Sequence, residues 1–243
     1  MSRFRAALIH VLISVSILLS VLGLMLGVWY PQPYFNLMQA RELLFIVFGV
    51  DVVLGPLLTL VVFKAGKKGL KLDLALIGVA QMAALAYGMF VVLSARPVYV
   101  VFNVDRFDVV SANAVFNPEK APFPEYRSLP WTGPKVVGAV KFPAQQLDAI
   151  MQAMGGKDIQ NMPQQYRPYA RFVGTVLQKS KPLADLYKRQ PTRHAEIDAV
   201  LAKHGYRAEQ VRCLMLLSDK YEMVMLIDAK TAQPLDALDM PLY

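Results

Sequence analysis

The sequence has little of what a metalloprotein needs. It contains one cysteine, Cys213, and three histidines among 243 residues. A single cysteine excludes an intramolecular disulfide, and its place in an apolar run that predicts a strand favours a buried thiol over a nucleophile. His194 and His204 are ten positions apart on one predicted helix, whereas two zinc ligands on a helix stand at i and i+4. We therefore expect no metal site and no cofactor.

Motifs of nucleotide binding and hydrolysis are also missing. The chain has no Walker A, G-x-G-x-x-G, G-x-S-x-G or H-E-x-x-H sequence, the patterns that mark phosphate loops, nucleophile elbows and zinc helices. Its closely spaced acidic residues lie in predicted turns or on solvated faces, where a hydrolytic pair of carboxylates is not indicated. We expect a protein that is not an enzyme and has no catalytic residues.

Charged residues are scarce, at 18% of the chain, and unevenly placed. Residues 1–96 carry 8 Lys and Arg against 3 Asp and Glu, a net charge of +5, and residues 97–243 carry 18 against 15, a net charge of +3. Most of the total of +8 therefore lies beside apolar runs, which favours membrane topology over a nucleic-acid partner. We expect no nucleic-acid binding.

Three long apolar runs dominate the first part of the chain. They cover residues 6–28, 43–63 and 74–93. At about 1.5 Å of helical rise per residue, each can cross a hydrocarbon core of roughly 30 Å. Cationic residues that flank membrane helices stay preferentially in the cytoplasm. Arg3, Arg5 and the lysines of residues 64–71 therefore predict a cytoplasmic N-terminus, with everything after Arg96 outside the cytoplasm.

These patterns predict an α+β protein with two domains. Residues 1–96 form a three-helix transmembrane bundle in a lipid bilayer, and residues 97–243 form a mixed α+β domain in which strands are followed by helices and then by strands. We expect strands at 98–104, 107–111 and 136–142, a helix from Pro143 to Met154, a helix capped by Thr192 and ended by Gly205, and a hairpin of 211–217 and 221–228.

A stripe of small residues marks one face of the first predicted span. Ser16, Ser20, Gly23 and Gly27 are spaced by 4, 3 and 4 positions, which places them on one side of a helix. Small residues let membrane helices approach closely, and packing contact is the main attraction between helices already in lipid. This face is expected to pack against the chain's own second or third helix, or against a partner's helix.

Asp51 is an acidic residue near the middle of the second predicted span. An ionised side chain at that depth costs at least about 2.5 kcal/mol on insertion scales, so it needs a partner or an inner crevice. Counted from the lysine loop, Gln81 and Tyr87 of the third span come to a similar depth. Asp51 is expected either to tie the second helix to the third, or to contact a partner's membrane helix, or to take part in proton transport.

Gly55 and Pro56 follow Asp51 by one turn. Proline has no N–H, so in an α-helix Pro56 leaves the carbonyl of Val52 without its donor and favours a kink. The second span is therefore expected to be least regular beside its acidic residue.

Several sequence strings resemble the TfpX/TfpZ family of type IV pilin accessory proteins. The resemblance is strong over residues 1–111 and looser beyond them. It is carried by residues 29–31 (WYP), 49–60 (GVDVVLGPLLTL), 71–77 (KLDLALI), 86–88 (AYG), 95–99 (ARPVY), 104–107 (VDRF) and 226–231 (LIDAKT).

This resemblance implies an inner-membrane, chaperone-like protein of a Gram-negative bacterium. Such a protein binds or stabilises its cognate major type IV pilin, through the pilin's membrane helix and its head domain, and promotes pilus assembly. The candidate contacts with the pilin helix are Ser16, Ser20, Gly23, Gly27, Asp51, Gly55, Pro56, Gln81 and Tyr87. The alternatives are a membrane-anchored periplasmic enzyme acting on pilin or an envelope polymer, and a periplasmic sensor, which would lack a cytoplasmic output domain.

Overall fold

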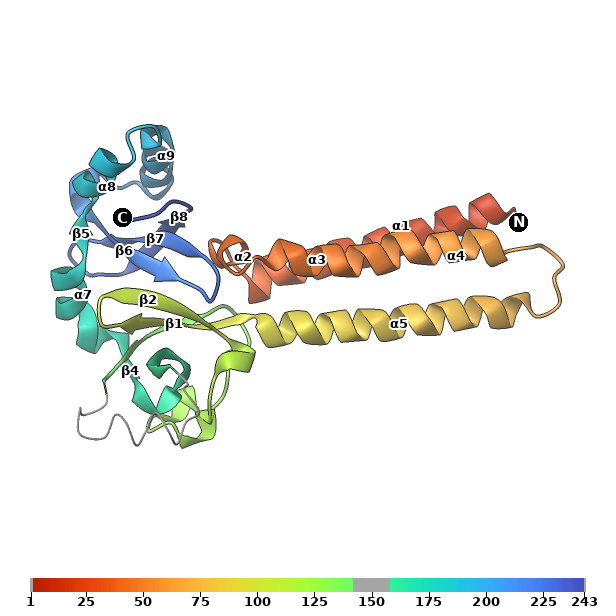
Figure 1. Cartoon of the computed structure of the whole chain (residues 1–243), viewed down its shortest axis with the longest axis horizontal. Helices are drawn as coiled ribbons and strands as arrows, with labels where there is room; N and C mark the ends of the chain where they lie inside the picture. Colours follow the sequence, from red (N-terminus) through yellow and green to blue (C-terminus); the bar gives the residue numbers. More distant parts are fainter. Residues whose placement is uncertain (1, 142–157, 243) are drawn as a thin grey trace. The chain divides into compact units, whose positions relative to one another are not determined.

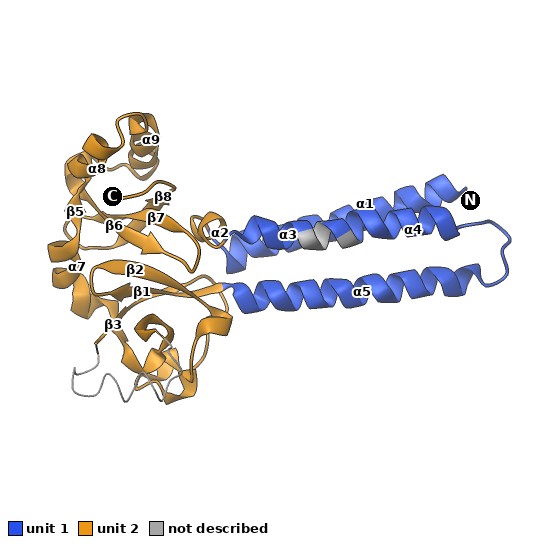
Figure 2. Ribbon diagram, viewed as in Figure 1, with its two compact units in different colours: residues 1–31, 39–96 blue, residues 32–38, 97–243 orange. Residues whose placement is uncertain are grey.

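The computed structural model describes residues 2–141 and 158–242, apart from the side chains of residues 46–48 and 50. The chain divides into two compact units, each of which is described by itself (Figures 1 and 2). The first comprises Met1–Pro31 and Gln39–Arg96, and the second comprises Gln32–Met38 and Pro97–Tyr243. The segment 32–38, which connects the first two apolar runs of the sequence, therefore belongs to the unit that contains the sheet.

The first unit is helical. Its elements are α1 (Arg3–Leu24), the π-helical turn η1 (Met25–Trp29), α3 (Ala40–Phe48), the π-helical turn η2 (Gly49–Leu54), α4 (Gly55–Val62) and α5 (Leu70–Ala95). Helix α1 packs against α4, and α5 packs against α3 and α4 (Figure 1). The run from α3 to α4 is thus the shared neighbour of the two long helices.

Among the described residues, two helices of this unit are long and apolar enough to cross a membrane. They are Arg3–Trp29 and Leu70–Ala95, and only 17% and 6% of their most apolar windows are buried within the protein. Apolar surface on this scale is unfavourable in water and favourable in lipid. The prediction of a third span is not met, because the run 43–63 is divided by η2 and contributes only a shorter apolar helix, Asp51–Val62.

The second unit mixes strands with short helices. Its strands are β1 (Pro97–Asn103), β2 (Arg106–Ser111), β3 (Lys135–Ala139), β4 (Tyr166–Pro168), β5 (Lys181–Pro182), β6 (Val211–Leu217), β7 (Glu222–Asp228) and β8 (Pro234–Leu238). Its helices are α2 (Tyr34–Leu37), α7 (Val173–Lys179), α8 (Leu183–Arg189) and α9 (His194–His204), with 3-10 turns at Ala112–Ala114, Pro118–Lys120, Pro124–Tyr126, Ile159–Asn161, Pro163–Gln165, Tyr169–Phe172 and Ala208–Gln210.

Within the described residues, these strands form one mixed sheet. The strand order is β4-β3-β1-β2-β6-β7-β8, with β5 paired to β6. Two antiparallel hairpins, β1–β2 and β6–β7, are joined edge to edge by parallel pairing of β2 with β6, while β3 lies parallel to β1. Strand β1 is buried along its whole length, as expected of a strand that is covered on both faces.

Both faces of the sheet are covered by apolar side chains. On one face, Phe102 and Phe107 pack in a core that also contains Val176 of α7 and Leu37 of α2. The opposite face of β1 packs against Tyr126 and neighbouring aromatic residues, and the corresponding face of β6 and β7 is covered by α8 and α9. The short segment 34–37 therefore supplies core residues to a sheet that begins some sixty positions later.

The sequence predicted most of these elements. The mixed α+β class, the strands near 98–104 and 107–111, and the final hairpin are confirmed. The predicted cap at Thr192 is wrong, because α9 begins after Arg193. Glu196 forms a forked ion pair with Arg193 (Nη2 to Oε2, 2.6 Å) and does not pair with Thr192. The helix predicted for 143–154 lies outside the described residues.

Candidate functional site

A groove in the helical unit is the candidate site. It is a cavity of about 160 Å³ between α1 and α5, with η2 between them. Its lining is mostly apolar, with polar groups from each of the three elements. The lining residues are His10, Ile13, Ser14, Ile17, Asp51, Gly78, Gln81, Met82 and Leu85.

Asp51 is the acidic residue of this groove. The residue is 6% exposed, and its Oδ1 atom has no hydrogen-bond partner among the residues that the structure describes. A buried polar atom without a partner is costly, and most are paired in native proteins. Asp51 therefore has a carboxylate oxygen that none of the described residues satisfies.

The backbone of Asp51, in contrast, is held by Gln81. The Nε2 atom of Gln81 donates a hydrogen bond of 3.3 Å to the Asp51 carbonyl oxygen. In a π-helical turn each carbonyl accepts from the N–H five residues later. For Asp51 that residue is Pro56, which has no N–H. The free carbonyl is thus one residue earlier than an α-helical register predicts, and the side chain of Gln81 satisfies it.

Gly55 makes room for this bond. A Cβ atom at Gly55 would lie 1.9 Å from Nε2 of Gln81 and 2.5 Å from its Cδ atom. Since real Cβ atoms do not approach heavy atoms this closely, glycine is required for Gln81 to keep this position. The contact between Asp51 and Gln81 therefore depends on both Gly55 and Pro56. Their closeness in the sequence and the predicted depth of Gln81 suggested that these four residues lie together.

The sequence reasoning missed a second polar contact. Nδ1 of His10 on α1 and Oγ1 of Thr59 on α4 are hydrogen-bonded at 2.6 Å, and Thr59 is buried. Ser14, one turn after His10, is also buried and lines the groove. Depth in the membrane could have indicated this contact. His10 lies about one helical turn after Arg5, and Thr59 lies about one turn before Phe63, so both are at a similar depth from the cytoplasmic side.

The other candidate residues do not face this groove. Tyr87 is 71% exposed on α5, so of the two polar residues expected at this depth it is Gln81 that contacts Asp51. The small residues of α1 are exposed as well, and a Cβ atom at Gly23 or Gly27 would meet nothing within 4 Å. Packing of this face against the chain's own second or third helix is therefore excluded in the structure. The exposed small residues are Ser16, Ser20, Gly23 and Gly27.

A second, apolar hollow lies beside the groove on α1. It is shallow and open, because all of its lining residues belong to one helix: Ile9, Leu12, Ile13, Ser16 and Ile17. Ile13 and Ile17 line both concavities, and Ser16 belongs to the small-residue face. The groove, the hollow and the small-residue face therefore adjoin one another along α1.

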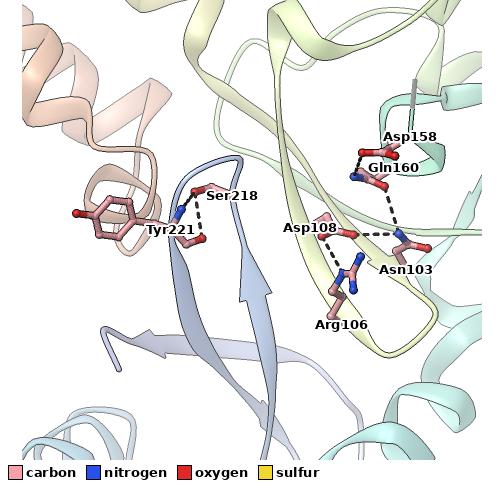
Figure 3. Close-up of polar contacts among 7 residues, drawn as sticks. All are labelled: Asn103, Arg106, Asp108, Asp158, Gln160, Ser218 and Tyr221. Atoms are coloured by element: carbon pink, nitrogen blue, oxygen red, sulfur yellow. Dashed lines mark hydrogen bonds and ion pairs between the residues drawn. The ribbon is translucent and has the colours of Figure 1, made fainter. Parts of the chain in front are cut away.

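A polar cluster at the β1–β2 hairpin is the main alternative site (Figure 3). Asn103 donates to Asp108 Oδ2 at 3.1 Å and to Gln160 Oε1 at 3.2 Å, while Arg106 Nε lies 3.3 Å from Asp108 Oδ1. Burial raises the pKa of Asp108, and the Asn103 hydrogen bond and the Arg106 charge partly offset that effect. Both carboxylate oxygens have partners, so we interpret this cluster as support for the hairpin.

The remaining chemistry-bearing residues are held in structural contacts. Cys213 is buried in β6, and burial raises its thiol pKa to about 12. His194 Nε2 lies 2.8 Å from the Tyr187 carbonyl oxygen, and His204 Nε2 lies 2.9 Å from Asp236. Across residues 2–141 and 158–242, no three His, Cys, Asp or Glu side chains are grouped to hold a metal ion.

Comparison with known proteins shows what this chain is similar to. The family model described as fimbrial assembly protein FimB matches residues 1–39. A fimbrial assembly protein of serogroup I from Dichelobacter nodosus is 31% identical, over 96% of this chain and 95% of that protein. The serogroup E1 protein of the same organism is 30% identical over the same shares of both chains.

A third relative aligns with a smaller part. The fimbrial assembly protein of serogroups C1 and C2 from Dichelobacter nodosus is 38% identical over 113 residues, which are 46% of this chain and 86% of that protein. No solved structure matches the chain.

Proposed function

The chain belongs to the fimbrial assembly protein family, and we propose that it acts in fimbrial biogenesis as a chaperone-like partner of its cognate type IV pilin. In this proposal it is a multi-pass protein of the inner membrane, with a cytoplasmic N-terminus and a periplasmic sheet unit. It binds or stabilises the pilin in the membrane, by its membrane helix and also by its head domain, and promotes its assembly into the pilus without performing catalysis.

The observation that carries this proposal is the surface along α1. Its small-residue face is exposed, and its apolar hollow shares Ile13 and Ile17 with the groove. In the groove, one carboxylate oxygen of Asp51 has no hydrogen-bond partner among the described residues. Small faces allow close packing of helices in lipid, where burial of apolar surface gives no driving force between helices. A pilin waiting in the membrane presents a long apolar helix, and this surface is suited to such a helix.

Membrane insertion of the helical unit supports the same conclusion. The two long helices expose most of their apolar side chains, and the basic residues at Arg3, Arg5 and the 64–71 loop favour the cytoplasmic side. The run α3–η2–α4 lies against both helices. Two crossings alone would leave the N-terminus and the sheet unit on the same side of the membrane, so the proposed topology requires this run, although η2 divides it, to make the return crossing between them. Within it, Gln81 satisfies the backbone carbonyl that Pro56 leaves free.

Photo-crosslinking in cells tests where the pilin binds. A photoreactive amino acid at Ser16 or Met82 should crosslink to pilin, because Ser16 lies on the open face of α1 and Met82 lines the groove. The matched control is Leu76, which is 60% exposed on α5 and does not line the groove. Equal crosslinking from all three positions, or none from any, would contradict binding at this surface.

Replacing the carboxylate tests the role of Asp51. Asp51→Leu should lower co-purification of pilin without lowering the abundance of the accessory protein itself. A parallel loss of both would instead show that Asp51 only stabilises the helical unit.

A further inference from the structure

Two exposed aromatic side chains of the sheet unit carry an inference about the bilayer surface. We propose that the end of the sheet at which β1 begins lies on the periplasmic surface of the bilayer, with the rings of Trp131 and Tyr221 among the lipid headgroups. The inference rests on the membrane insertion in the proposed function, and it adds a lipid-binding surface in the sheet unit.

The first step is the exposure of these rings. Trp131 is 61% exposed and Tyr221 is 45% exposed. In the described part of the sheet unit, the other exposed large apolar side chain is Val104, at 39%. Tryptophan is highly buried on average, because most of its large ring is apolar. An indole ring exposed to this extent is better accommodated where water is partly replaced by an apolar medium.

The second step is the register of the strands, which places Trp131 at one end of the sheet. Strand β3 runs parallel to β1, and its first residue, Lys135, pairs with Tyr99 near the start of β1. Trp131 precedes Lys135 by four residues. The Tyr99 hydroxyl donates to the Ser128 carbonyl oxygen in the same loop, at 3.4 Å. Loop 128–134 therefore enters the sheet at the end where β1 begins.

The turn between β6 and β7 lies at the same end. Strand β6 runs parallel to β2, which returns toward the start of β1. In the turn, the Tyr221 N–H donates to Ser218 Oγ at 3.1 Å, and the tyrosine ring points away from the strands (Figure 3). The Ser218 hydroxyl lies 3.0 Å from the Leu37 carbonyl oxygen, which ties the turn to the segment 32–38. The two rings thus lie at one end of the sheet, on either side of β1.

The third step is the length of the chain that links this end to the candidate spans. The spans end at Trp29 and Ala95, and the parts of the sheet unit that follow them begin at Gln32 and Pro97. At no more than about 3.6 Å per residue, these links extend about 11 Å and about 7 Å. A span ends where the hydrocarbon core meets the headgroups. In a membrane-inserted protein, this end of the sheet is therefore held within reach of the headgroup region.

The chemistry of the rings favours lipid headgroups as the occupant of this surface. Tryptophan and tyrosine are enriched at membrane–water interfaces, because each combines an apolar ring with one polar group. Net charge gives no such preference, since the exposed acidic residues Asp219 and Glu222 flank the exposed Lys220 in the turn. We therefore expect the contact to depend on the rings and not on anionic lipid.

Fluorescence quenching by lipid headgroups tests this inference. The fluorophore NBD is attached to Thr132→Cys or Lys220→Cys in the full-length protein, so that both aromatic rings remain. The matched controls are Asp105→Cys and Lys230→Cys, in turns at the opposite end of the sheet. All four positions are exposed, and the native Cys213 is buried.

The protein is reconstituted in phosphatidylcholine vesicles that carry a nitroxide on the headgroup. The seven residues of β7 separate the two ends of the sheet by about 24 Å, at about 3.4 Å per residue. We expect quenching at Thr132 and Lys220 to be about threefold stronger than at the two control positions. Equal quenching at all four positions would overturn the inference.

Removal of the rings shows whether they make the contact. The double variant Trp131→Ser with Tyr221→Ser should lower quenching at Thr132 and Lys220 about twofold. Unchanged quenching in this variant would reject the anchoring role of the rings. Quenching that requires phosphatidylglycerol and disappears at high salt would indicate adsorption by charge and would also contradict the proposal. The four positions in the protein with both rings decide the outcome even where the double variant does not fold.

The vesicles contain no pilin, so this test is separate from the test of pilin binding. If the predicted quenching is found and pilin does not crosslink to Ser16 or Met82, the lipid contact stands and the proposed partner is rejected. If pilin crosslinks there while the four positions are quenched equally, the pilin-binding function stands and the lipid contact is rejected. NBD fluorescence at Thr132 that changes only when pilin is added would assign this surface to a protein partner and exclude the lipid contact.

Discussion

Gln81 on α5 donates a hydrogen bond from Nε2 to the backbone carbonyl oxygen of Asp51 on η2, at 3.3 Å. The two residues are thirty positions apart in the sequence. Their contact depends on Pro56, which removes the helical donor of that carbonyl, and on Gly55, which leaves space for the amide. The Gln81 side chain thereby replaces the backbone hydrogen bond that is missing from the π-helical turn η2.

A methyl group at Gly55 should break this contact. In Gly55→Ala the new Cβ atom displaces the Gln81 amide, so the Asp51 carbonyl loses its donor, at a cost of about 1–3 kcal/mol in the free energy of unfolding. Thermal unfolding in lipid nanodiscs measures the loss. Gly49→Ala is the control, since a Cβ atom there meets nothing within 4 Å.

A double-mutant cycle shows whether the loss belongs to the Gln81 contact. Gln81→Ala removes the same hydrogen bond, so the double variant Gly55→Ala with Gln81→Ala should cost less than the two single variants added together. Strict additivity would mean that Gly55 acts through some other contact.

Leu37 should matter for the stability of the sheet unit. It is fully buried in the core beside Phe107, and the Ser218 hydroxyl donates to its carbonyl oxygen at 3.0 Å. Leu37→Ala removes buried side-chain atoms at a cost of about 2–5 kcal/mol. Amide hydrogen exchange in β6 and β7 should accelerate accordingly. Substitution of the exposed neighbour Asn36 provides the control. If Leu37→Ala left the hydrogen exchange of β6 and β7 unchanged, a core role for this segment would be refuted.

Membrane orientation predicts opposite labelling of two engineered cysteines. A membrane-impermeant maleimide applied to intact spheroplasts should label Lys230→Cys outside and leave Lys68→Cys unlabelled until the membrane is opened. Both lysines are exposed in the structure. The native Cys213 provides a silent background, because it is buried and its thiol pKa is raised to about 12. Labelling of Lys68→Cys in intact spheroplasts would contradict a cytoplasmic location of the 64–71 loop.

Asp108 should give the sheet unit a defined dependence on pH. Burial raises its pKa above the ordinary value of 3.8, so the folded chain holds this proton more tightly than the unfolded chain does. Its contribution to stability is therefore present below the unfolded pKa and is lost as pH rises through the folded pKa. Asn cannot titrate, so the stability of Asp108→Asn relative to wild type should increase over that window.

Denaturant unfolding at a series of pH values checks the Asp108 prediction. The informative quantity is the slope of the stability difference with pH, because Asn at this position also changes the ion pair with Arg106. A difference that decreases as pH rises would show that Asp108 is better stabilised as a carboxylate in the folded chain.

Local sequence patterns predicted those helices and strands whose formation depends on residues close by in the sequence. The apolar runs at 6–28 and 74–93 became the two long helices, and alternating β-branched and aromatic residues near 98–111 became a hairpin. The hydrophobic period and the caps of a segment are properties of that segment alone. The cap at Thr192 was predicted wrongly: the helix begins one residue later, after Arg193, and Glu196 is paired with Arg193.

By itself, the sequence determined the α+β class, the apolar helices with their charged flanks, and the presence of an acidic residue inside a helical run. Tertiary structure alone decided that Gln81 rather than Tyr87 meets Asp51, that His10 meets Thr59, and that Leu37 packs in the sheet core. These contacts join residues far apart in the chain. They depend on how each helix is rotated about its axis and on a one-residue shift at η2, and a change of one residue turns a helical side chain by about 100°.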